Sequence, residues 1–361
     1  MPDGVWVTVG TLTLPYKTLE TLHAGVSEVR VKQNLRTSLK QVTKLISLLG
    51  REDTLAMNEV SFLREIDHPN VARVFDVADV AGSDPALAEV EIIMPYYEKG
   101  SLLDAMSTGK RFSSAEARDI TVKALRGLAH LHDHRRILHR DLKPANLFLA
   151  DDDTLVKIGD FGEAIKMDDM GTTEPLLSPQ HWTAPETFTG SRYAVTSEIY
   201  SIGMTLRELL SGPFPYDDYT REELAERLSK NRRAVRDRHL CCAIHVPTSL
   251  RLIAQRASDR SPDRRFQNAE AMLTALLSAR FIDWQWPVEG DGEMAWTGVW
   301  HGVNLRLSVR RLRGQKWRAQ GECLYPSGWR RISGCADADA QDPLDAARTV
   351  FSQIERQLTN T

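Results

Sequence analysis

The sequence contains few cysteines, four among 361 residues. Cys241 and Cys242 are adjacent, Cys323 and Cys335 lie far downstream, and no Cys-x-x-Cys pair or His/Cys ligand spacing is present. Neither a disulfide-stabilised scaffold nor a structural zinc site is therefore indicated. We expect reduced thiols with mostly structural roles.

Long apolar runs and a dominant charge of one sign are also lacking. No stretch approaches the ~20 apolar residues that a membrane-spanning helix requires, and Met1-Pro2-Asp3-Gly4 lacks the basic segment and apolar core of a signal peptide. The formal net charge of −3 provides no overall attraction to nucleic acid or anionic membranes. These absences favour a cytoplasmic protein without a membrane span.

What is present is the composition of a globular protein, 42% hydrophobic and 26% charged. Strand-like runs at residues 18–31 and 39–47, with a helical pattern at 55–66 that ends before Pro69, predict a β-rich first part. Helical spacing of apolar residues then dominates as far as residue 282. Its main helices are predicted at residues 114–132, 199–210, 222–228, 250–257 and 269–277.

The last part of the chain, from about residue 288, changes pattern again. Short strands are predicted at residues 296–311, 316–324 and 329–334, with turn residues between them, and a helix at 343–358. We therefore expect a small ββ(β)α domain after the helical part.

The most informative segment is His139-Arg140-Asp141-Leu142-Lys143-Pro144-Ala145-Asn146, followed fourteen residues after Asn146 by Asp160-Phe161-Gly162. It places a general base, a cation and two oxygen ligands suited to Mg²⁺ at fixed intervals. Phosphoryl transfer requires such groups because positioning and charge neutralisation stabilise its transition state.

This segment resembles the catalytic core of the eukaryotic-like protein serine/threonine kinases. The resemblance is to the serine/threonine branch because Lys143 follows Asp141 by two residues. The resemblance covers about residues 16–282 and implies an α+β, bilobal fold. The implied division is an N-terminal extension at 1–15, a β-rich N-lobe at 16–94, and the hinge and helical C-lobe at 95–282. The accessory α/β domain at 283–361 lies outside the resemblance.

The resemblance implies ATP and Mg²⁺ as cofactors and hydroxyl groups of unspecified proteins as phosphate acceptors. Asp141 would be the catalytic base, and Lys143 would neutralise the transferred phosphoryl group. Asn146 and Asp160 would hold Mg²⁺.

The same family pattern assigns the residues around ATP. Lys44 would reach the α- and β-phosphates and pair with Glu59, and the alternatives at these two positions are Lys40 and Glu65. The other implied ATP-binding residues are Gly25 in the phosphate-covering loop, Val29, Val42 and Phe148 around the adenine, Met94 as gatekeeper, and Pro95 and Tyr97 in the hinge.

Two positions depart from the family pattern. The phosphate-covering loop has Gly25 as its single glycine, and Glu198 stands where the family has an aspartate that accepts backbone N–H groups of the catalytic loop. These departures favour the alternative of a pseudokinase, a nucleotide-binding or scaffolding module, whereas the intact Lys44 and Asp141 oppose it. A small-molecule phosphotransferase is a third hypothesis, which the Ala-Pro-Glu run at residues 184–186 disfavours.

The segment after Asp160 has features of its own. Glu186 is predicted to pair with Arg265, with Arg264 as the rival partner. Arg140 beside the base suggests control by phosphorylation of this segment, because an arginine there attracts an anion. The candidate phosphosites are Thr172, Thr173 and Ser178, and Ser178 is also a candidate for the substrate-facing position of the family.

The C-terminal part is rich in basic residues with interleaved aromatic residues. Three roles stay open for it: protein docking, nucleic-acid binding and a purely structural role. The basic residues are Arg306, Arg310, Arg311, Arg313, Lys316, Arg318, Arg330 and Arg331, with Glu322 as the one acid among them.

Overall fold

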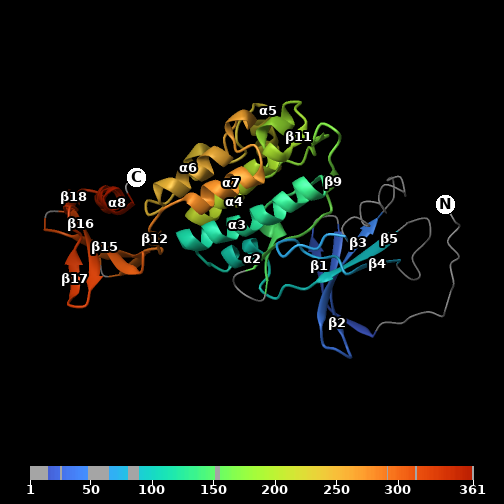
Figure 1. Cartoon of the computed structure of the whole chain (residues 1–361), viewed down its shortest axis with the longest axis horizontal. Coiled ribbons are helices and arrows are strands. Elements are labelled where there is room, and N and C mark those ends of the chain that lie inside the picture. Colours follow the sequence, from blue (N-terminus) through green and yellow to red (C-terminus); the bar gives the residue numbers. More distant parts are fainter. Residues whose placement is uncertain are drawn as a thin grey trace. The chain divides into compact units, whose positions relative to one another are not determined.

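The computed structural model describes residues 15–24, 27–47, 65–79, 89–150, 155–290, 292–313 and 315–359. The chain divides into two compact units, residues 1–98 and residues 99–361. The first is built on strands, and the second combines a helical part with further strands and a last helix (Figure 1). The predicted α+β class is confirmed. The predicted domain boundaries stay a prediction.

The first unit contains a five-stranded antiparallel sheet in the order β1-β2-β3-β5-β4. Asn34 shapes the turn between β2 and β3, because its side-chain oxygen accepts hydrogen bonds from the backbone N–H groups of Arg36 and Thr37. The predicted run at residues 18–31 covers parts of two strands. The strands are β1 Tyr16–Ala24, β2 Ser27–Asn34, β3 Lys40–Ser47, β4 Asp76–Asp79 and β5 Glu89–Pro95.

The helical part of the second unit begins with capped helices. Ser113 caps α3, and Glu116 bonds back to the Ser113 N–H, which satisfies N–H groups that a helix start leaves unpaired. A π-helical turn, His130–His134, continues α3. The predicted helices are found as α3 Ser114–Ala129, α4 Val195–Ser211, α5 Arg221–Ser229, α6 Thr248–Ala257 and α7 Ala269–Ser278, and a short α2 Leu102–Ser107 precedes them.

Helix α4 is the central helix of this part. It is buried along most of its length and packs against α3 and α6. A glycine permits the close approach of α6, because a Cβ atom added at Gly203 would lie 2.6 Å from the Cβ of Ala257. Short strand pairs connect the helices: β6 Ile137–Leu138 with β9 Ile165–Lys166, β7 Leu147–Leu149 with β8 Val156–Ile158, and β10 Thr172–Thr173 with β11 Tyr193–Ala194.

The C-terminal strands form an antiparallel sheet in the order β12-β14-β15-β16-β17, with β13 paired to β14 and β18 paired to β16. The prediction of one strand at residues 296–311 was wrong, because His301 and Gly302 adopt positive φ and turn the chain into a hairpin. The strands are β12 Asp283–Trp284, β13 Val288–Gly290, β14 Glu293–Trp300, β15 Val303–Arg311, β16 Trp317–Tyr325, β17 Gly328–Arg331 and β18 Ala338–Ala340.

Helix α8, Pro343–Thr359, packs against β15, β16 and β18 of this sheet (Figure 1). Its apolar face and the inward residues of the strands form one core, in which the rings of Trp296 and Phe351 meet edge to face at 5.3 Å. Inward residues alternate along β15 and β16, as expected for a sheet covered on one face.

Polar contacts connect this sheet and helix to the helical part. Asp283 accepts the Ala115 N–H at 2.8 Å, and the Trp286 indole donates to the Phe112 carbonyl at 2.8 Å. The carboxylate of Glu355 on α8 accepts the backbone N–H of Thr248 at 2.7 Å. The C-terminal strands are therefore anchored at the start of α3 and at the start of α6.

Among the described residues, none of the helices has the length and apolar character needed to cross a membrane.

Candidate active site

The loop after β6 carries Asp141, whose carboxylate is surrounded by donor groups. Lys143 Nζ lies 3.0 Å from Asp141 Oδ1 and 2.8 Å from Oδ2, and Asn146 Nδ2 donates to Oδ2 at 2.9 Å. Asn146 Nδ2 also donates to the Asp141 backbone carbonyl at 2.7 Å, which fixes the loop around the carboxylate. The structure thus brings together Asp141, Lys143 and Asn146, the residues predicted to be catalytic.

A further residue, Gln180, reaches this carboxylate from a distant part of the sequence. Its Nε2 donates to Asp141 Oδ1 at 2.9 Å, and its Oε1 accepts from Lys143 Nζ at 3.2 Å. Sequence reasoning missed Gln180. The Ser178 carbonyl instead accepts the Thr183 hydroxyl at 3.0 Å, so Gln180 is the residue of this stretch that contacts Asp141.

Glu198, at the start of α4, braces the catalytic loop from a fully buried position. Its Oε1 accepts the Arg140 N–H at 2.6 Å, and its Oε2 lies 2.6 Å from His132 Nε2. The prediction that this carboxylate accepts a backbone N–H of the loop is confirmed. Arg140 has φ +65°, a conformation that costs about 1–3 kcal/mol for a residue with a side chain, and the bond to Glu198 helps to hold it.

The Arg140 side chain is held by backbone oxygens. Its Nε donates to the Glu163 carbonyl at 2.7 Å, and its Nη1 donates to the Glu174 carbonyl at 3.3 Å. The Glu163 carboxylate lies 3.9 Å from Nη2. This guanidinium therefore connects the catalytic loop to two points of the segment that follows Asp160.

Asp160 follows β8 and also has a positive φ, +57°. The segment is fixed to the catalytic loop through His139, whose Nε2 lies 2.9 Å from the Gly159 carbonyl and whose ring meets that of Phe161 at 5.0 Å. The Gly159 N–H donates to the Asn146 carbonyl at 3.0 Å. These contacts tie the Asp160 segment to the loop of Asn146, the other residue predicted to bind metal.

Four predicted ATP-binding residues lie on one face of the sheet in the first unit. Val29 pairs with Lys44 across β2 and β3, and Val42 pairs with Met94 across β3 and β5. Directly opposite residues share a face, and so do residues two apart in a strand. Lys44 therefore shares its face with the apolar Val29, Val42 and Met94.

The alternative lysine at the phosphate position has a different environment. Lys40 Nζ pairs with Glu98 at 2.7 Å near the protein surface and lies 5.5 Å from the centre of the Tyr96 ring. Pro95 ends β5 opposite Gln41, and Tyr97 is half-buried in the segment after it.

Several other predicted residues can be located. Phe148 lies in β7, half-buried, and pairs with Lys157 of β8. Glu65, the alternative to Glu59, is exposed. The predicted residues Gly25 and Glu59 lie outside the described residues.

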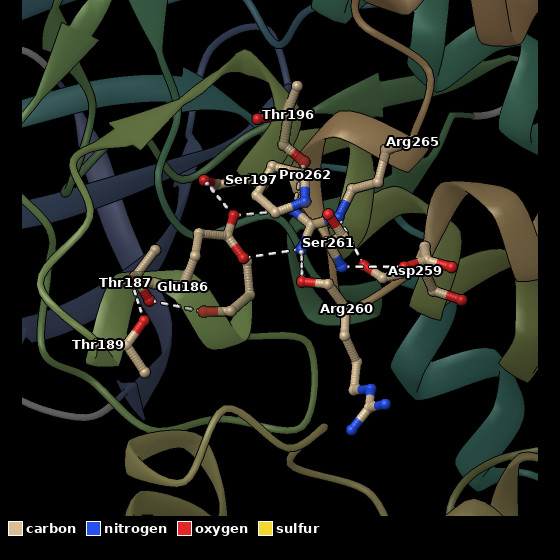
Figure 2. A network of polar contacts seen from close by, with 12 residues as sticks. Glu186, Thr187, Thr189, Thr196, Ser197, Asp259, Arg260, Ser261, Pro262 and Arg265 are labelled. Atoms are coloured by element: carbon tan, nitrogen blue, oxygen red, sulfur yellow. Dashed lines mark hydrogen bonds and ion pairs between the residues drawn. The ribbon is translucent and has the colours of Figure 1, made fainter.

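Glu186 and Arg265 form a buried, bidentate ion pair, as Figure 2 shows. The two guanidinium nitrogens of Arg265 donate to the two carboxylate oxygens of Glu186, each at 2.7 Å. Arg265 also donates to the Thr196 carbonyl at 2.9 Å, and the Ser197 hydroxyl donates to Glu186 at 2.8 Å. The predicted choice of Arg265 over Arg264 is confirmed.

A second buried carboxylate, Glu208, organises the region beyond α4. The Trp182 indole and the Tyr216 hydroxyl donate to it, each at 2.5 Å, and so does the Phe214 N–H at 2.9 Å. Burial raises the pKa of Glu208 to about 7, although these three donors oppose the shift. Trp182 lines the small cavity beside Asp141 together with Gln180, so Glu208 fixes one wall of the site.

The threonines proposed as phosphosites differ in environment. Thr172 is half-buried; its hydroxyl lies 3.0 Å from an Asp168 oxygen and accepts from Arg192 Nε at 2.7 Å. Thr173 is buried and pairs with Tyr193 of β11. Arg192 also pairs with the carboxylates of Asp168 and Glu174. The guanidinium of Arg192 thus lies where an anion on Thr172 would meet it.

Acidic partners neutralise part of the basic C-terminal sheet. Arg306 pairs with Glu322 at 2.6 Å and lies over the Trp329 ring at 4.5 Å. Arg318 pairs with Asp339 at 2.7 Å, and Arg331 pairs with Asp337, six residues after it, at 2.8 Å. The net positive charge of this sheet is therefore smaller than the basic residues between Arg306 and Arg331 indicate.

Comparison with known proteins accounts for this arrangement. A model of the protein kinase domain matches residues 20–278, which is most of the chain. The chain belongs to the protein kinase family. The matched region of the kinase ends before β12, so the C-terminal sheet and α8 follow the family domain.

Named relatives include kinases from fungi and plants. The SNF1-like protein kinase ssp2 of Schizosaccharomyces pombe is 32% identical over 211 residues, which are 56% of this chain and 35% of that protein. Serine/threonine-protein kinase ATG1b of Arabidopsis thaliana is 29% identical over 177 residues, 48% of this chain and 24% of that protein. The SNF1-related protein kinase catalytic subunit alpha KIN12 of the same plant is 27% identical over 221 residues, 60% of this chain and 43% of that protein. This kinase chain therefore spans less than half the length of these relatives.

Proposed function

We propose that this chain is a Mg·ATP-dependent serine/threonine protein kinase that transfers the γ-phosphate of ATP to protein hydroxyl groups. The observation that carries the proposal is the Asp141 carboxylate with Lys143 Nζ 2.8 Å away and Asn146 Nδ2 2.9 Å away. A base, a cation and a carboxamide in contact are the groups that phosphoryl transfer uses.

Asp141 would orient the acceptor hydroxyl and take its proton. Its carboxylate can do so because Lys143, Asn146 and Gln180 hold it at hydrogen-bonding distance in one position. Lys143 would compensate the charge of the transferred phosphoryl group. A fixed charge of this kind costs little reorganisation when the reaction occurs.

The residues present fit magnesium and nucleotide. Asn146 uses its amide nitrogen for both bonds to Asp141, so its side-chain oxygen is the atom suited to a metal, and Asp160 contributes a carboxylate. Oxygen ligands of this type are those that Mg²⁺ prefers. Bound Mg²⁺ would neutralise phosphate charge, and Lys44, on a sheet face shared with Val29, Val42 and Met94, would contact the nucleotide.

Thr172 is the autophosphorylation site that the local contacts favour. Its hydroxyl is half-buried beside Arg192, whereas Thr173 is buried. A phosphate at Thr172 would carry about −1.5 to −2 charges, attract Arg192 and repel Asp168. Phosphorylation would therefore rearrange the ion pairs of Arg192.

The proposal is tested by incubating the purified chain with γ-labelled ATP, Mg²⁺ and a generic basic protein substrate. We expect label on serine or threonine, and we expect Asp141→Asn to abolish it. The matched control is Asp263→Asn, an exposed aspartate on a turn before α7, which should label like wild type.

The pseudokinase hypothesis makes the opposite prediction in the same assay. Wild type would then bind nucleotide in a fluorescence titration and yet incorporate no more label than Asp141→Asn. Mass spectrometry of labelled wild type should find Thr172 phosphorylated, and label confined to tyrosine would contradict the serine/threonine assignment.

A further inference from the structure

A second group of charged residues lies around the C-terminal end of α5 and the segment that follows it. The residues line a cavity of about 400 Å³. This volume is within the range of about 300–1,000 Å³ that small-molecule sites occupy. Its lining consists of Arg227, Arg232, Arg233, Arg236, Arg238, Arg260 and Asp237.

The positive charge of this arginine pocket is only partly compensated. Arg233 pairs with Asp237 at 3.3 Å, and Arg236 pairs with Glu223 at 2.6 Å. Within the part of the chain that the structure describes, the other four lining arginines have no carboxylate partner: Arg227, Arg232, Arg238 and Arg260. Like charges gathered around a cavity raise the local affinity for anions.

Two of these arginines are held in place by backbone oxygens. Arg227 Nε donates to the Arg233 carbonyl at 3.0 Å and to the Ala234 carbonyl at 2.8 Å. Arg233 Nε donates to the Ser258 carbonyl at 3.0 Å. Both guanidiniums are therefore held in a fixed position, and that of Arg227 is not neutralised by a carboxylate.

Arg260 lies in the connection between α6 and α7, beside the Glu186–Arg265 ion pair. Its carbonyl accepts from Arg265 at 3.2 Å, while its side chain extends away from Glu186 and Arg265 (Figure 2). No dashed contact reaches its guanidinium in that view. The backbone of Arg260 is thus anchored, and its charge is presented to the cavity.

We propose that this arginine pocket binds a ligand carrying two or more phosphate groups. A phosphate monoester carries about −1.5 to −2 charges near neutral pH, so one group would leave about half of the uncompensated arginines unmatched. The planar guanidinium donates two parallel hydrogen bonds to phosphate oxygens, and it remains charged at every pH that the protein survives. The pocket belongs to other elements than Asp141, so this binding is independent of phosphoryl transfer.

Isothermal titration calorimetry of the full chain with inorganic tripolyphosphate tests the proposal. The buffer contains EDTA and no Mg²⁺, which prevents binding through metal at the active site, and 0.15 M salt. We expect wild type to bind tripolyphosphate saturably, and we expect the affinity to be at least tenfold lower in the double variant Arg232→Gln/Arg260→Gln. Both arginines are exposed, so this double variant should unfold at the same temperature as wild type.

Arg313→Gln is the matched control, because Arg313 is also exposed but lies in the turn between β15 and β16. The affinity of this variant should equal that of wild type. Asp141→Asn should also bind like wild type, which separates this proposal from the kinase assay. A peptide with two adjacent phosphoserines distinguishes a phosphorylated protein from a free oligophosphate as the natural source. Absence of saturable binding to both probes, or equal binding by the double variant, overturns the proposal.

Discussion

Asp141 is held from two sides of the chain, by Lys143 and Asn146 within its own loop and by Gln180 from the following segment. We predict that Gln180→Ala lowers kcat about 10- to 100-fold, because hydrogen bonds to charged groups contribute about 1.5–3 kcal/mol. Steady-state kinetics with a peptide substrate measure this effect. The KM for ATP should change little.

A second variant separates a positioning role of Gln180 from a purely structural role. Gln180→Glu keeps the size but places a second carboxylate beside Asp141, so it should be worse than Gln180→Ala. Gln267→Ala is the control, since Gln267 is exposed and bonds only to nearby carbonyls. If Gln180→Ala lowered the melting temperature and left kcat unchanged, the positioning role would be wrong.

The sequence predicted the site residues that share one short loop, but not the residue that reaches them from afar. Asp141, Lys143 and Asn146 have fixed spacing, and the turn Pro144–Asn146 folds Asn146 back onto Asp141. Gln180 is 39 positions from Asp141, and its role depends on the path of the intervening chain. Spacing along the sequence carries no information about that path.

At the level of elements, the Glu186–Arg265 pair fastens the end of the Asp160 segment to the turn before α7. We predict that Arg265→Met lowers the free energy of unfolding by about 3–5 kcal/mol, because it leaves the buried Glu186 carboxylate without its cation. Urea unfolding followed by circular dichroism measures the change.

The double variant Glu186→Leu/Arg265→Met gives the control for this pair. It removes both charges, so it should recover a large part of the lost stability. An Arg265→Met variant as stable as wild type would show that solvent reaches Glu186.

A second contact between elements replaces a missing helix cap. Helix α6 begins after Pro247, which has no side-chain hydrogen-bonding group, and Glu355 of α8 accepts the Thr248 N–H and hydroxyl instead. Glu355→Ala should therefore destabilise the protein by about 1–2 kcal/mol, the usual cost of losing a cap. Differential scanning calorimetry measures the loss, and Glu289→Ala, at an exposed strand position, should be neutral.

Element prediction succeeded where local patterns decide the structure. The helices of the second unit were located to within a few residues because their apolar residues recur at helical spacing. The hairpin at His301 and Gly302 was missed because apolar residues resume directly after these two residues, at Val303. The cap from Glu355 could not be predicted, since it joins positions 107 residues apart.

On the scale of the second unit, the C-terminal sheet and the helical part enclose His245. This imidazole is buried, meets the Trp286 ring edge to face at 4.8 Å, and lies beside Trp284 and Phe351 in the wall of a small cavity. Burial lowers the pKa of His245 to about 4, because the charged imidazolium loses its hydration there.

Stability should therefore depend on pH through His245. Between about pH 4 and pH 6.5 the unfolded chain binds a proton at this position and the folded chain does not, so acidification favours unfolding. At pH 4 the loss amounts to about 3 kcal/mol, and above pH 6.5 this contribution to the pH dependence vanishes. Urea midpoints measured from pH 4.5 to 7.5 should fall less steeply on acidification for His245→Gln than for wild type. His301→Gln, in an exposed turn, should keep the wild-type slope, and equal slopes for His245→Gln and wild type would mean that His245 is protonated in the folded chain.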